Sequence, residues 1–451
     1  MSLPPSPNHS PARTEWQLLR SPYSYLDGLS KELGETFMLR RWGHNIVIFS
    51  NPEHVKEIFA DGGEELEAGR FNEVLAPLLG DRSVLMVDGH EHRRKRNLLL
   101  PPLRGDRLRA YGQTMLDISD DAIDAFAHGK PFSFHKPMQD ITLRVIIQTI
   151  LGFEGTRQEA MIRSTKRLLK LAIWPLLLAP FMQFDLGRFS HYGRYRRALA
   201  DIDALLYEAI SRRQKDGTRG PDILSLLLEA RDADGDAMSR DELRDELLTL
   251  LVAGHETTAT ALTWAMHWLL ESPELLGDLR AAIDALGPDP TPEAIARCEL
   301  LDATVREALR LVPVVPQVGR VLSKDRRVGE WDLKKGDIVV CSIYLAHRRR
   351  ETFPDPEKFD PIRFLGKKMS ASEFFPFGGG VRRCIGMAFA LHEMKMVLAR
   401  VVTRTELVRA GKRSSDVIRR AITIAPADGL RVVLRNRRTR PTKQTAPRAA
   451  A

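Results

Sequence analysis

Hydrophobic and polar positions follow two different periods along the chain, and the change of period marks out its elements. Between residues 91 and 312 helical patterns dominate, interrupted only by loops. Before this region, residues 37–50 form two apolar runs around Gly43 and predict a β-hairpin. Residues 52–60 then predict a short helix. The first two thirds of the chain therefore combine a small sheet with a large helical region.

Strand patterns return after the helical region. Residues 318–322, 331–334 and 338–343 form short apolar runs that are separated by turn residues. Two further runs, 421–424 and 430–434, flank a Pro-Ala-Asp-Gly turn and predict a last β pair. These patterns favour a mainly α protein with small β-sheets (α+β), in which the sheets stand at one side of a large helical body.

One predicted helix is longer than the others. Ser239 and Glu242 match a capping box, good helix formers continue to Glu271, and a Ser-Pro step then ends the helix. About thirty residues at 1.5 Å each give a helix of roughly 45 Å. Its middle, residues 253–258, reads Ala-Gly-His-Glu-Thr-Thr. Glycine, acid and adjacent threonines indicate a local distortion where a ligand binds. The alternative is an ordinary core helix with a capped Thr pair.

Small residues line one face of this long helix. Thr249, Ala253, Thr257 and Ala261 are four positions apart and therefore point the same way. A face that is small and partly polar leaves room for a ligand beside the helix.

Length and composition indicate one large domain. The chain has 451 residues, 43% of them hydrophobic, and no linker or repeat divides it. We predict a catalytic domain over 37–434, a polar N-terminal extension with a first helix over 1–36, and a basic, disordered tail over 435–451. The polar start predicts no signal peptide and no transmembrane anchor. Three cysteines make no disulfide framework, so a reducing cytoplasm is the expected location.

The net charge of +9 comes partly from the predicted tail, and no nucleic-acid-binding motif accompanies it. We therefore expect no nucleic acid among the partners of the chain. A solubilising role for the tail is the simpler interpretation.

Residues 377–386 read Phe-Gly-Gly-Gly-Val-Arg-Arg-Cys-Ile-Gly and carry the clearest chemical signal. Cys384 stands just before an apolar helix, whose free N–H groups and dipole are expected to lower the pKa of the thiol. The glycines would let the backbone approach something flat and bulky. One thiolate without a second cysteine nearby indicates haem iron rather than zinc or an iron–sulfur cluster. The alternative is a buried structural thiol.

The spacing Phe-x-x-Gly-x-Arg-x-Cys-x-Gly resembles the haem-binding loop of the cytochrome P450 family, the haem-thiolate monooxygenases, and the chain resembles their soluble bacterial members. Further family motifs follow in the family order from about residue 37 to residue 434. The resemblance implies haem b as the cofactor and Cys384 as the axial ligand of its iron. The residues that it assigns to haem binding are Cys384, Phe377, Gly378, Arg382, His92, Arg96, Arg320 and Ala253.

Residues 253–258 resemble the oxygen-binding stretch of this family. The resemblance implies that Thr257 hydrogen-bonds dioxygen and that Glu256 relays protons, which cleavage of the O–O bond requires. Glu307 and Arg310 match the family's Glu-x-x-Arg motif, and Arg363 matches the third member of the same group. The implied role of these three residues is a buried, fully paired network beneath the thiolate segment.

The substrate is expected to be lipophilic: a terpenoid, a steroid or a fatty-acid-like chain. Residues 313–318 resemble the loop that passes over the haem, residues 72–85 would form another wall, and residues 174–184 fall where the family has a mobile lid. Core helix is the alternative for this last segment. The residues predicted to line the pocket are Val314, Val315, Gln317, Val318 and Thr249.

Electrons are expected to come from outside, because the chain contains no flavin or reductase segment. A basic patch on the thiolate side would steer an acidic ferredoxin, supplied by a ferredoxin reductase. The residues predicted for this patch are Arg93, Arg94, Lys95, Arg383, Lys367 and Lys368. Two alternatives to a monooxygenase remain: a peroxygenase that uses peroxide directly, and a haem or lipid sensor without turnover.

Overall fold

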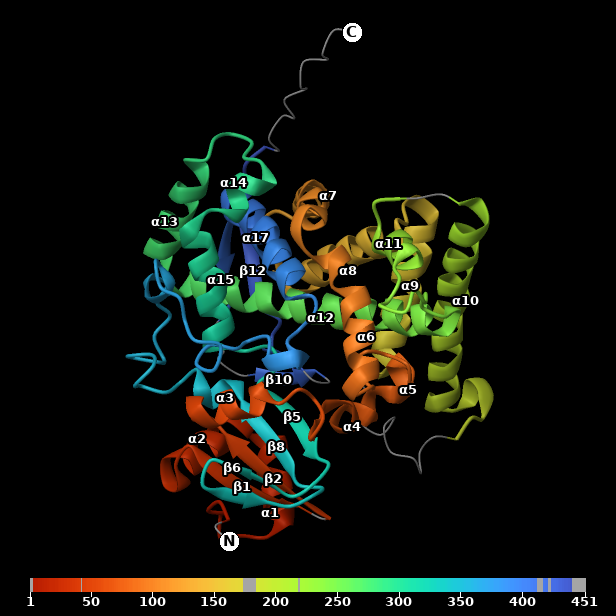
Figure 1. Ribbon diagram of the computed structural model, residues 1–451. Helices are drawn as coiled ribbons and strands as arrows, with labels where there is room; N and C mark the ends of the chain where they lie inside the picture. Colours follow the sequence, from red (N-terminus) through yellow and green to blue (C-terminus); the bar gives the residue numbers. More distant parts are fainter. Residues whose placement is uncertain are drawn as a thin grey trace.

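The computed structural model describes residues 3–41, 43–172, 184–217, 220–411, 417–420 and 423–439. A sheet-rich part near the N-terminus lies beside a larger helical part, as the sequence predicts (Figure 1). The segment interpreted as a lid lies outside the described residues except for Phe184, and so does the tail from residue 440.

The helices range from a single turn to the 32 residues of α12. The predicted short helix at 52–60 is confirmed as α3, which Asn51 caps through its side chain. In chain order the helices are α1 Pro11–Arg20, α2 Pro22–Leu33, α3 Pro52–Ala60, α4 Ala68–Asn72, α5 Ala76–Leu79, α6 Gly89–Leu99, α7 Gly105–Asp124, α8 His135–Leu151, α9 Gly155–Ala172, α10 His191–Asp216, α11 Ile223–Glu229, α12 Arg240–Glu271, α13 Pro273–Asp284, α14 Pro292–Ala296, α15 Glu299–Leu311, α16 Ile343–Ala346 and α17 Met387–Arg404.

The strands are short and belong to several small sheets. In chain order they are β1 Thr36–Arg41, β2 His44–Phe49, β3 Leu66–Glu67, β4 Pro131–Ser133, β5 Gln317–Leu322, β6 Arg326–Val328, β7 Trp331–Leu333, β8 Ile338–Ser342, β9 Thr405–Arg409, β10 Val417–Arg420, β11 Thr423–Pro426 and β12 Arg431–Arg437. The largest sheet has the order β1-β2-β8-β5-β3. The predicted hairpin is its β1–β2 edge, and Gly43 turns the chain there with φ of +85°.

The last predicted β pair is wrong, because its two runs belong to different sheets. β11 pairs with β10, whereas β12 lies between β4 and β9. The turn at 427–429 therefore carries the chain from one sheet to another. A local alternation of apolar residues predicts a strand but not the strand with which it pairs. β12 also extends to Arg437, so the first residues of the predicted tail belong to a sheet.

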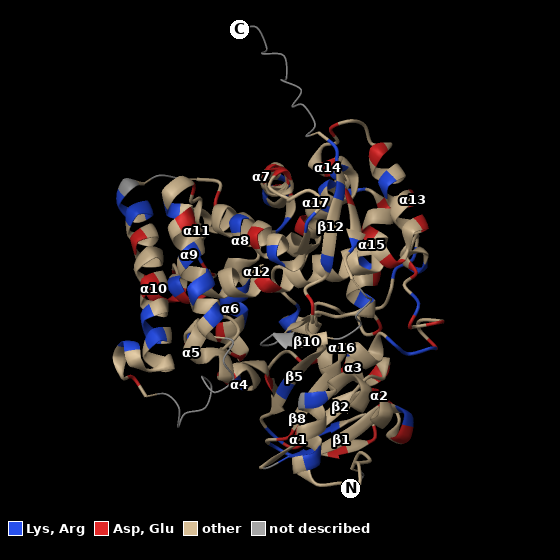
Figure 2. Ribbon diagram, turned by 180° about the vertical axis from the view of Figure 1, so that it is seen from behind, with Lys and Arg blue, Asp and Glu red and all other residues tan. Residues whose placement is uncertain are grey.

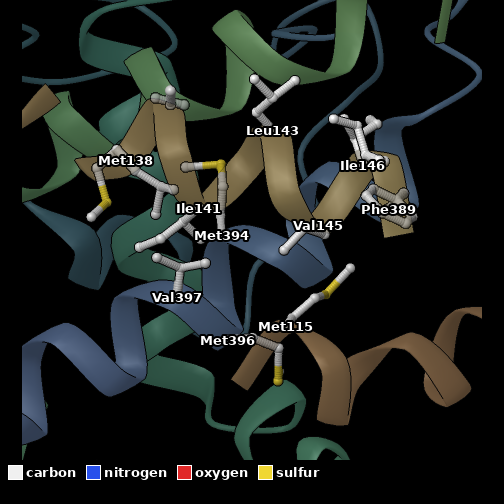
Figure 3. Packing of buried hydrophobic residues seen from close by; sticks show 14 of the residues in the cluster. Met115, Met138, Ile141, Leu143, Val145, Ile146, Phe389, Met394, Met396 and Val397 are labelled. Carbon is white, nitrogen blue, oxygen red and sulfur yellow. The ribbon is translucent and has the colours of Figure 1, made fainter. Parts of the chain in front are cut away.

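Helix α12 crosses the helical part, and its predicted capping box is present: Ser239 accepts from the Glu242 amide, and Glu242 accepts from the Ser239 amide. Its main neighbour is α8, and α17 packs against α12 as well. Figure 3 shows Ile141 of α8 next to Met394 and Val397 of α17, within the largest apolar core. The long helix is therefore fixed from more than one side by apolar packing.

Over the described part of the chain, no helix combines the length and the apolar character that a membrane crossing needs. Arg94 of α6 bonds to Glu242 of α12, and Arg382, just before α17, bonds to the Val87 carbonyl ahead of α6. The candidate site lies where these three segments come together.

Candidate active site

The Cys384 loop is a tight turn packed against α3. The Cys384 amide donates to the Phe377 carbonyl at 2.9 Å, and Gly378 and Gly380 have φ of +67° and +62°. A Cβ on Gly379 would overlap the ring of Phe59, and one on Gly380 would overlap the backbone of that residue. Glycine at 379 and 380 is thus required by the close approach of α3.

The Cys384 side chain is exposed, although protein surrounds the loop. Burial raises the pKa of its thiol, and neither the Gly386 amide nor the Arg96 charge reverses that rise. The expectation that the helix end lowers this pKa is wrong, because burial outweighs the nearby amide and charge.

Helix α12 presents a gap in its side-chain cover at the predicted oxygen site. Ala253 is exposed in the middle of a helix whose neighbouring turns are mostly buried. The Thr257 hydroxyl donates to the Ala253 carbonyl at 2.7 Å, and the Thr258 hydroxyl donates to the Gly254 carbonyl at 3.0 Å. The helix stays α-helical through residues 253–258, so these two bonds are not accompanied by the local distortion that the sequence predicts.

Gly254 has a packing role that the sequence did not reveal. A Cβ at this position would overlap Ile146 of α8, so glycine lets the two helices approach closely. On the same side, the Thr142 hydroxyl of α8 donates to the His255 carbonyl at 3.1 Å. His255 is buried, and burial lowers its pKa to about 4. It is therefore a neutral packing residue.

The carboxylate of Glu256 contacts α8. Its Oε2 accepts from Gln139 Nε2 at 2.6 Å, and its Oε1 lies 3.5 Å from Nε2 of the buried His135. Glu256 and Thr257 are adjacent in sequence, but their side chains bond differently. Thr257 forms its hydrogen bond within α12, whereas Glu256 forms its hydrogen bond with α8. Sequence reasoning missed Gln139 and His135, because both belong to a helix more than a hundred positions earlier.

The predicted network of Glu307, Arg310 and Arg363 forms as expected. Glu307 accepts from Arg310 Nε at 2.7 Å, Arg310 Nη2 at 2.9 Å and Arg363 Nε at 3.1 Å. The Asp360 amide also donates to Glu307, at 2.8 Å. Glu307 and Arg310 are 0% exposed. The remaining Arg310 donors reach the carbonyls of His347, Pro356 and Lys358, so the buried guanidinium is fully bonded.

The four predicted propionate ligands come from three distant segments and gather in one place. The pKa of His92 falls to about 3, because the group is buried and Arg382, Arg96 and Arg320 lie near it. Arg382 pairs with Asp88, and Arg320 donates to the Gly319 carbonyl at 2.8 Å. Within the described residues, the side chains of His92 and Arg96 have no hydrogen-bond partner.

This excess of positive charge fits a dianionic ligand such as the two propionates of haem. Buried guanidinium groups favour carboxylates in direct, charge-assisted contact. An accessible thiol and a helix face left open at Ala253 supply the other features that haem needs. The donor set therefore fits haem better than a small metal ion, and no cluster of acidic, His or Cys side chains that could hold such an ion occurs among the described residues.

The predicted basic patch is only partly correct. Lys95 is 0% exposed and bonds to Glu242 and the Arg82 carbonyl, while Arg94 pairs with Asp232 and Glu242. Both cations belong to the interior contact between α6 and α12. Lys367, Lys368 and Arg93 are exposed, and Arg383 is half-buried. Figure 2 shows that Lys and Arg are also common on α9 and α10.

The predicted pocket residues have mixed surroundings. Val314 is buried, and its carbonyl accepts from the Ile424 amide at 3.0 Å. Val315 and Val318 are half-buried, and Gln317 is exposed where β5 begins. The Thr249 hydroxyl is already engaged, with Ser83 Oγ and the Asp245 carbonyl each at 2.7 Å. Thr249 therefore joins α12 to the loop at 80–85 and does not offer a free hydroxyl to a ligand.

Comparisons with known proteins find similar chains. The family model for Cytochrome P450 matches residues 4–423. Cytochrome P450 135B1 of Mycobacterium tuberculosis is 36% identical over 456 residues, which cover 100% of this chain and 94% of that protein. Cytochrome P450 138 of Mycobacterium bovis is 33% identical over 398 residues, 87% of each chain.

Solved structures share the fold. The structure titled "Retinoic acid bound cyanobacterial CYP120A1" has a TM-score of 0.84 and 25% identity, covering 97% of this chain and 99% of that one. The heme domain of cytochrome P450DA has a TM-score of 0.87 and 24% identity, covering 97% and 98%. These likenesses confirm the predicted mainly helical fold with small sheets.

Proposed function

Because the chain belongs to the cytochrome P450 family, we propose that it hydroxylates or epoxidises a lipophilic small molecule with electrons from a ferredoxin. The family consists of haem-dependent monooxygenases, so the chain is an oxidoreductase with a haem cofactor. The observation that carries the proposal is the exposed thiol of Cys384 near a cluster of cations in which His92 and Arg96 have no hydrogen-bond partner among the described residues.

Each side chain of the site has a proposed part in binding. When bound, haem supplies an iron at which dioxygen is reduced and its O–O bond is split. Cys384 would hold that iron, and the cluster of His92, Arg96, Arg320 and Arg382 would neutralise the propionates. Ala253 adds little volume to α12, and so leaves room for dioxygen beside the helix.

The acid and alcohol of α12 would deliver protons. The Thr257 hydroxyl oxygen can accept a hydrogen bond from water while its proton points to the Ala253 carbonyl. The Glu256 carboxylate would exchange a proton with such a water, and Gln139 and His135 would keep it oriented between transfers.

Replacement of Thr257 tests this assignment. We expect Thr257→Ala to lower the product formed per electron by about tenfold with O₂, because proton delivery loses its orienting hydroxyl. A reaction driven by added peroxide should be spared. Thr263→Ala is the matched control, since Thr263 makes the same 2.7 Å bond to a carbonyl four residues earlier, at Ala259, and is buried. Unchanged O₂ coupling in Thr257→Ala would show that Thr257 has no such role.

The substrate class is proposed from the apolar wall of Val314, Val315 and Val318. A fold neighbour was solved with retinoic acid, a lipophilic carboxylic acid, bound to it. Spectral titration of the ferric protein with terpenoids, steroids and fatty acids tests the class. A saturable shift with one class identifies the chemistry. Absence of any shift across the panel would contradict the apolar pocket, and a haem protein that oxidises nothing with a competent ferredoxin system would favour the sensor alternative.

The electron donor is proposed to be an acidic ferredoxin that docks near Lys367 and Lys368. Reversal of both charges to Glu should slow reduction by ferredoxin at least about tenfold at low salt and much less at high salt. Lys170→Glu is the control, because Lys170 is equally exposed but lies on α9. If both variants slow reduction equally, the docking site lies elsewhere.

A further inference from the structure

His347 connects the buried ion-pair network to the segment that leads to Cys384. It caps the C-terminus of α16 and is 0% exposed. Its carbonyl accepts from Arg310 Nη1 at 2.9 Å, and its ring Nε2 accepts from the Phe375 amide at 3.0 Å. The residue thus bonds to the network with its backbone and to the thiolate segment with its side chain.

The Phe375 bond restricts the protonation state of the ring. An amide donates only to a nitrogen without a proton, so Nε2 must be bare and the neutral ring carries its proton on Nδ1. Burial and the nearby charges of Arg310 and Arg348 lower the pKa of His347 well below its usual value, which agrees with this state. The rings of Phe353, Phe374 and Phe375 enclose the imidazole, with centroids 5.1 to 6.1 Å away.

Backbone hydrogen bonds continue from this point toward Cys384. The Phe375 carbonyl accepts from the Gly378 amide at 2.9 Å, and the Phe377 carbonyl accepts from the Cys384 amide at 2.9 Å. Each step joins residues at the two ends of a turn. A fixed position for the Phe375 amide therefore restricts the whole turn that carries the thiol.

We propose that the His347 imidazole is a positioning residue for the iron ligand, acting as the hydrogen-bond acceptor that ties the Cys384 loop to the Glu307–Arg310 network. The inference deepens the proposed function and rests on Cys384 being the haem ligand. The proposal concerns the Nε2 atom of His347 in particular. Any ring of similar size could fill the apolar surroundings, but only an acceptor atom can bond to the Phe375 amide. Without that acceptor, the Phe375 amide is buried with no partner, and the loop gains alternative positions.

Four variants separate the acceptor from the shape of the side chain. His347→Phe keeps a flat ring but removes the acceptor. His347→Gln can place an amide oxygen near the Nε2 position, and His347→Asn is too short to do so. Phe353→Leu changes one wall of the enclosure and leaves the acceptor in place.

The readout is the spectrum of the reduced carbonyl complex, which distinguishes thiolate from other ligation, together with its rate of conversion to the non-thiolate form. We expect this rate to rise about tenfold in His347→Phe and His347→Asn, a change typical of lost outer-shell partners of a metal ligand. His347→Gln and Phe353→Leu should stay close to wild type. Circular dichroism and thermal unfolding of each variant check that the fold is retained.

Each result decides the proposal. Equal rates in His347→Phe and wild type overturn it, and so do equal rises in His347→Gln and His347→Asn. If His347→Phe does not fold, the Gln–Asn pair alone decides, and rapid hydrogen exchange of the Phe375 amide in the wild-type holoprotein would also contradict the bond. A wild-type protein without a thiolate-type spectrum would instead refute the proposed function.

Discussion

Two buried clusters of charge lie in this protein, and they differ in completeness. Around Glu307, every donor of Arg310 reaches a carboxylate or a carbonyl within the chain. Around His92, three guanidinium groups lie close together, and among the described residues only that of Arg382 has an ion-pair partner, Asp88. Both clusters are enclosed by protein, so burial does not explain the difference.

The comparison shows how a scaffold differs from a ligand site. A cluster that satisfies its own charges has nothing to gain from a ligand, and it fixes the segments that meet there. A cluster with surplus positive charge has its lowest electrostatic energy only when an anion is bound to it. The first lies behind the Cys384 loop and the second gathers α6, β5 and the start of that loop.

Removal of the central carboxylate breaks the complete cluster and should have the largest effect. Glu307→Gln leaves a buried guanidinium without its counter-charge, so we expect a loss of about 3–5 kcal/mol in the free energy of unfolding. Denaturant unfolding of the apo and haem-loaded protein measures it. Both forms should lose similar amounts, because the network needs no ligand.

The control for this variant is an exposed ion pair of the same length. Arg144 and Glu159 are 2.7 Å apart, as are Arg310 and Glu307. Glu159→Gln should cost less than about 1 kcal/mol, since solvent screens such a pair. If the two variants lose the same free energy of unfolding, the complete pairing of the buried network contributes nothing beyond an exposed ion pair.

Removal of one cation from the incomplete cluster should separate the apo form from the loaded form. Arg96→Met relieves repulsion in the apo protein, and we expect its stability to be unchanged or higher. Affinity for haem should fall by about 1.5–3 kcal/mol, the value of a hydrogen bond to a charged group. Haem titration and unfolding of the apo protein measure the two effects. A variant that loses stability only in the apo form would contradict the assignment of Arg96 to a ligand site.

A third buried group extends the comparison, because its carboxyl is held in the neutral form by burial. Glu246 of α12 is 0% exposed, and burial raises its pKa to about 8 from an ordinary value of 4.5. The stability that this group contributes is present below pH 4.5 and is lost as the pH rises toward 8, by about 1 kcal/mol per pH unit. Glu246→Gln cannot ionise, so its advantage over wild type should grow over that window and then level off.

Thermal unfolding of both proteins between pH 5 and pH 8 measures this advantage across the titration. The buried histidines are common to both proteins, so their own titration cancels in the difference. A difference that does not depend on pH would show that Glu246 keeps its ordinary pKa, with Lys95 as its compensating charge.

The sequence predicts features that depend on neighbouring residues and misses those that depend on distant ones. The hairpin at Gly43, the helix α3 and the capping box at Ser239 follow local rules and are confirmed. The pairing of β11 and the burial of Lys95 depend on which segment packs opposite, and no local pattern contains that information.

The site shows the same division. Motif spacing identifies Glu307, Arg310 and Arg363, and the structure brings them together. Spacing could not reveal that His347 bonds to the Phe375 amide, since the two residues are 28 positions apart and only one uses its side chain. The raised pKa of Cys384 was also missed, because burial outweighs the helix end and burial cannot be read from ten residues.

The surplus of positive charge around His92 also has a consequence for the life of the chain after synthesis. A ligand that binds only the folded form stabilises it by mass action, so molecules that have not yet received haem are the least stable ones. If the chain is made faster than haem is supplied, the molecules without haem are expected to be degraded sooner. Proteases would then limit the amount of chain to the amount of haem. Limited proteolysis with and without added haem would reveal this difference as a change in the lifetime of the intact chain.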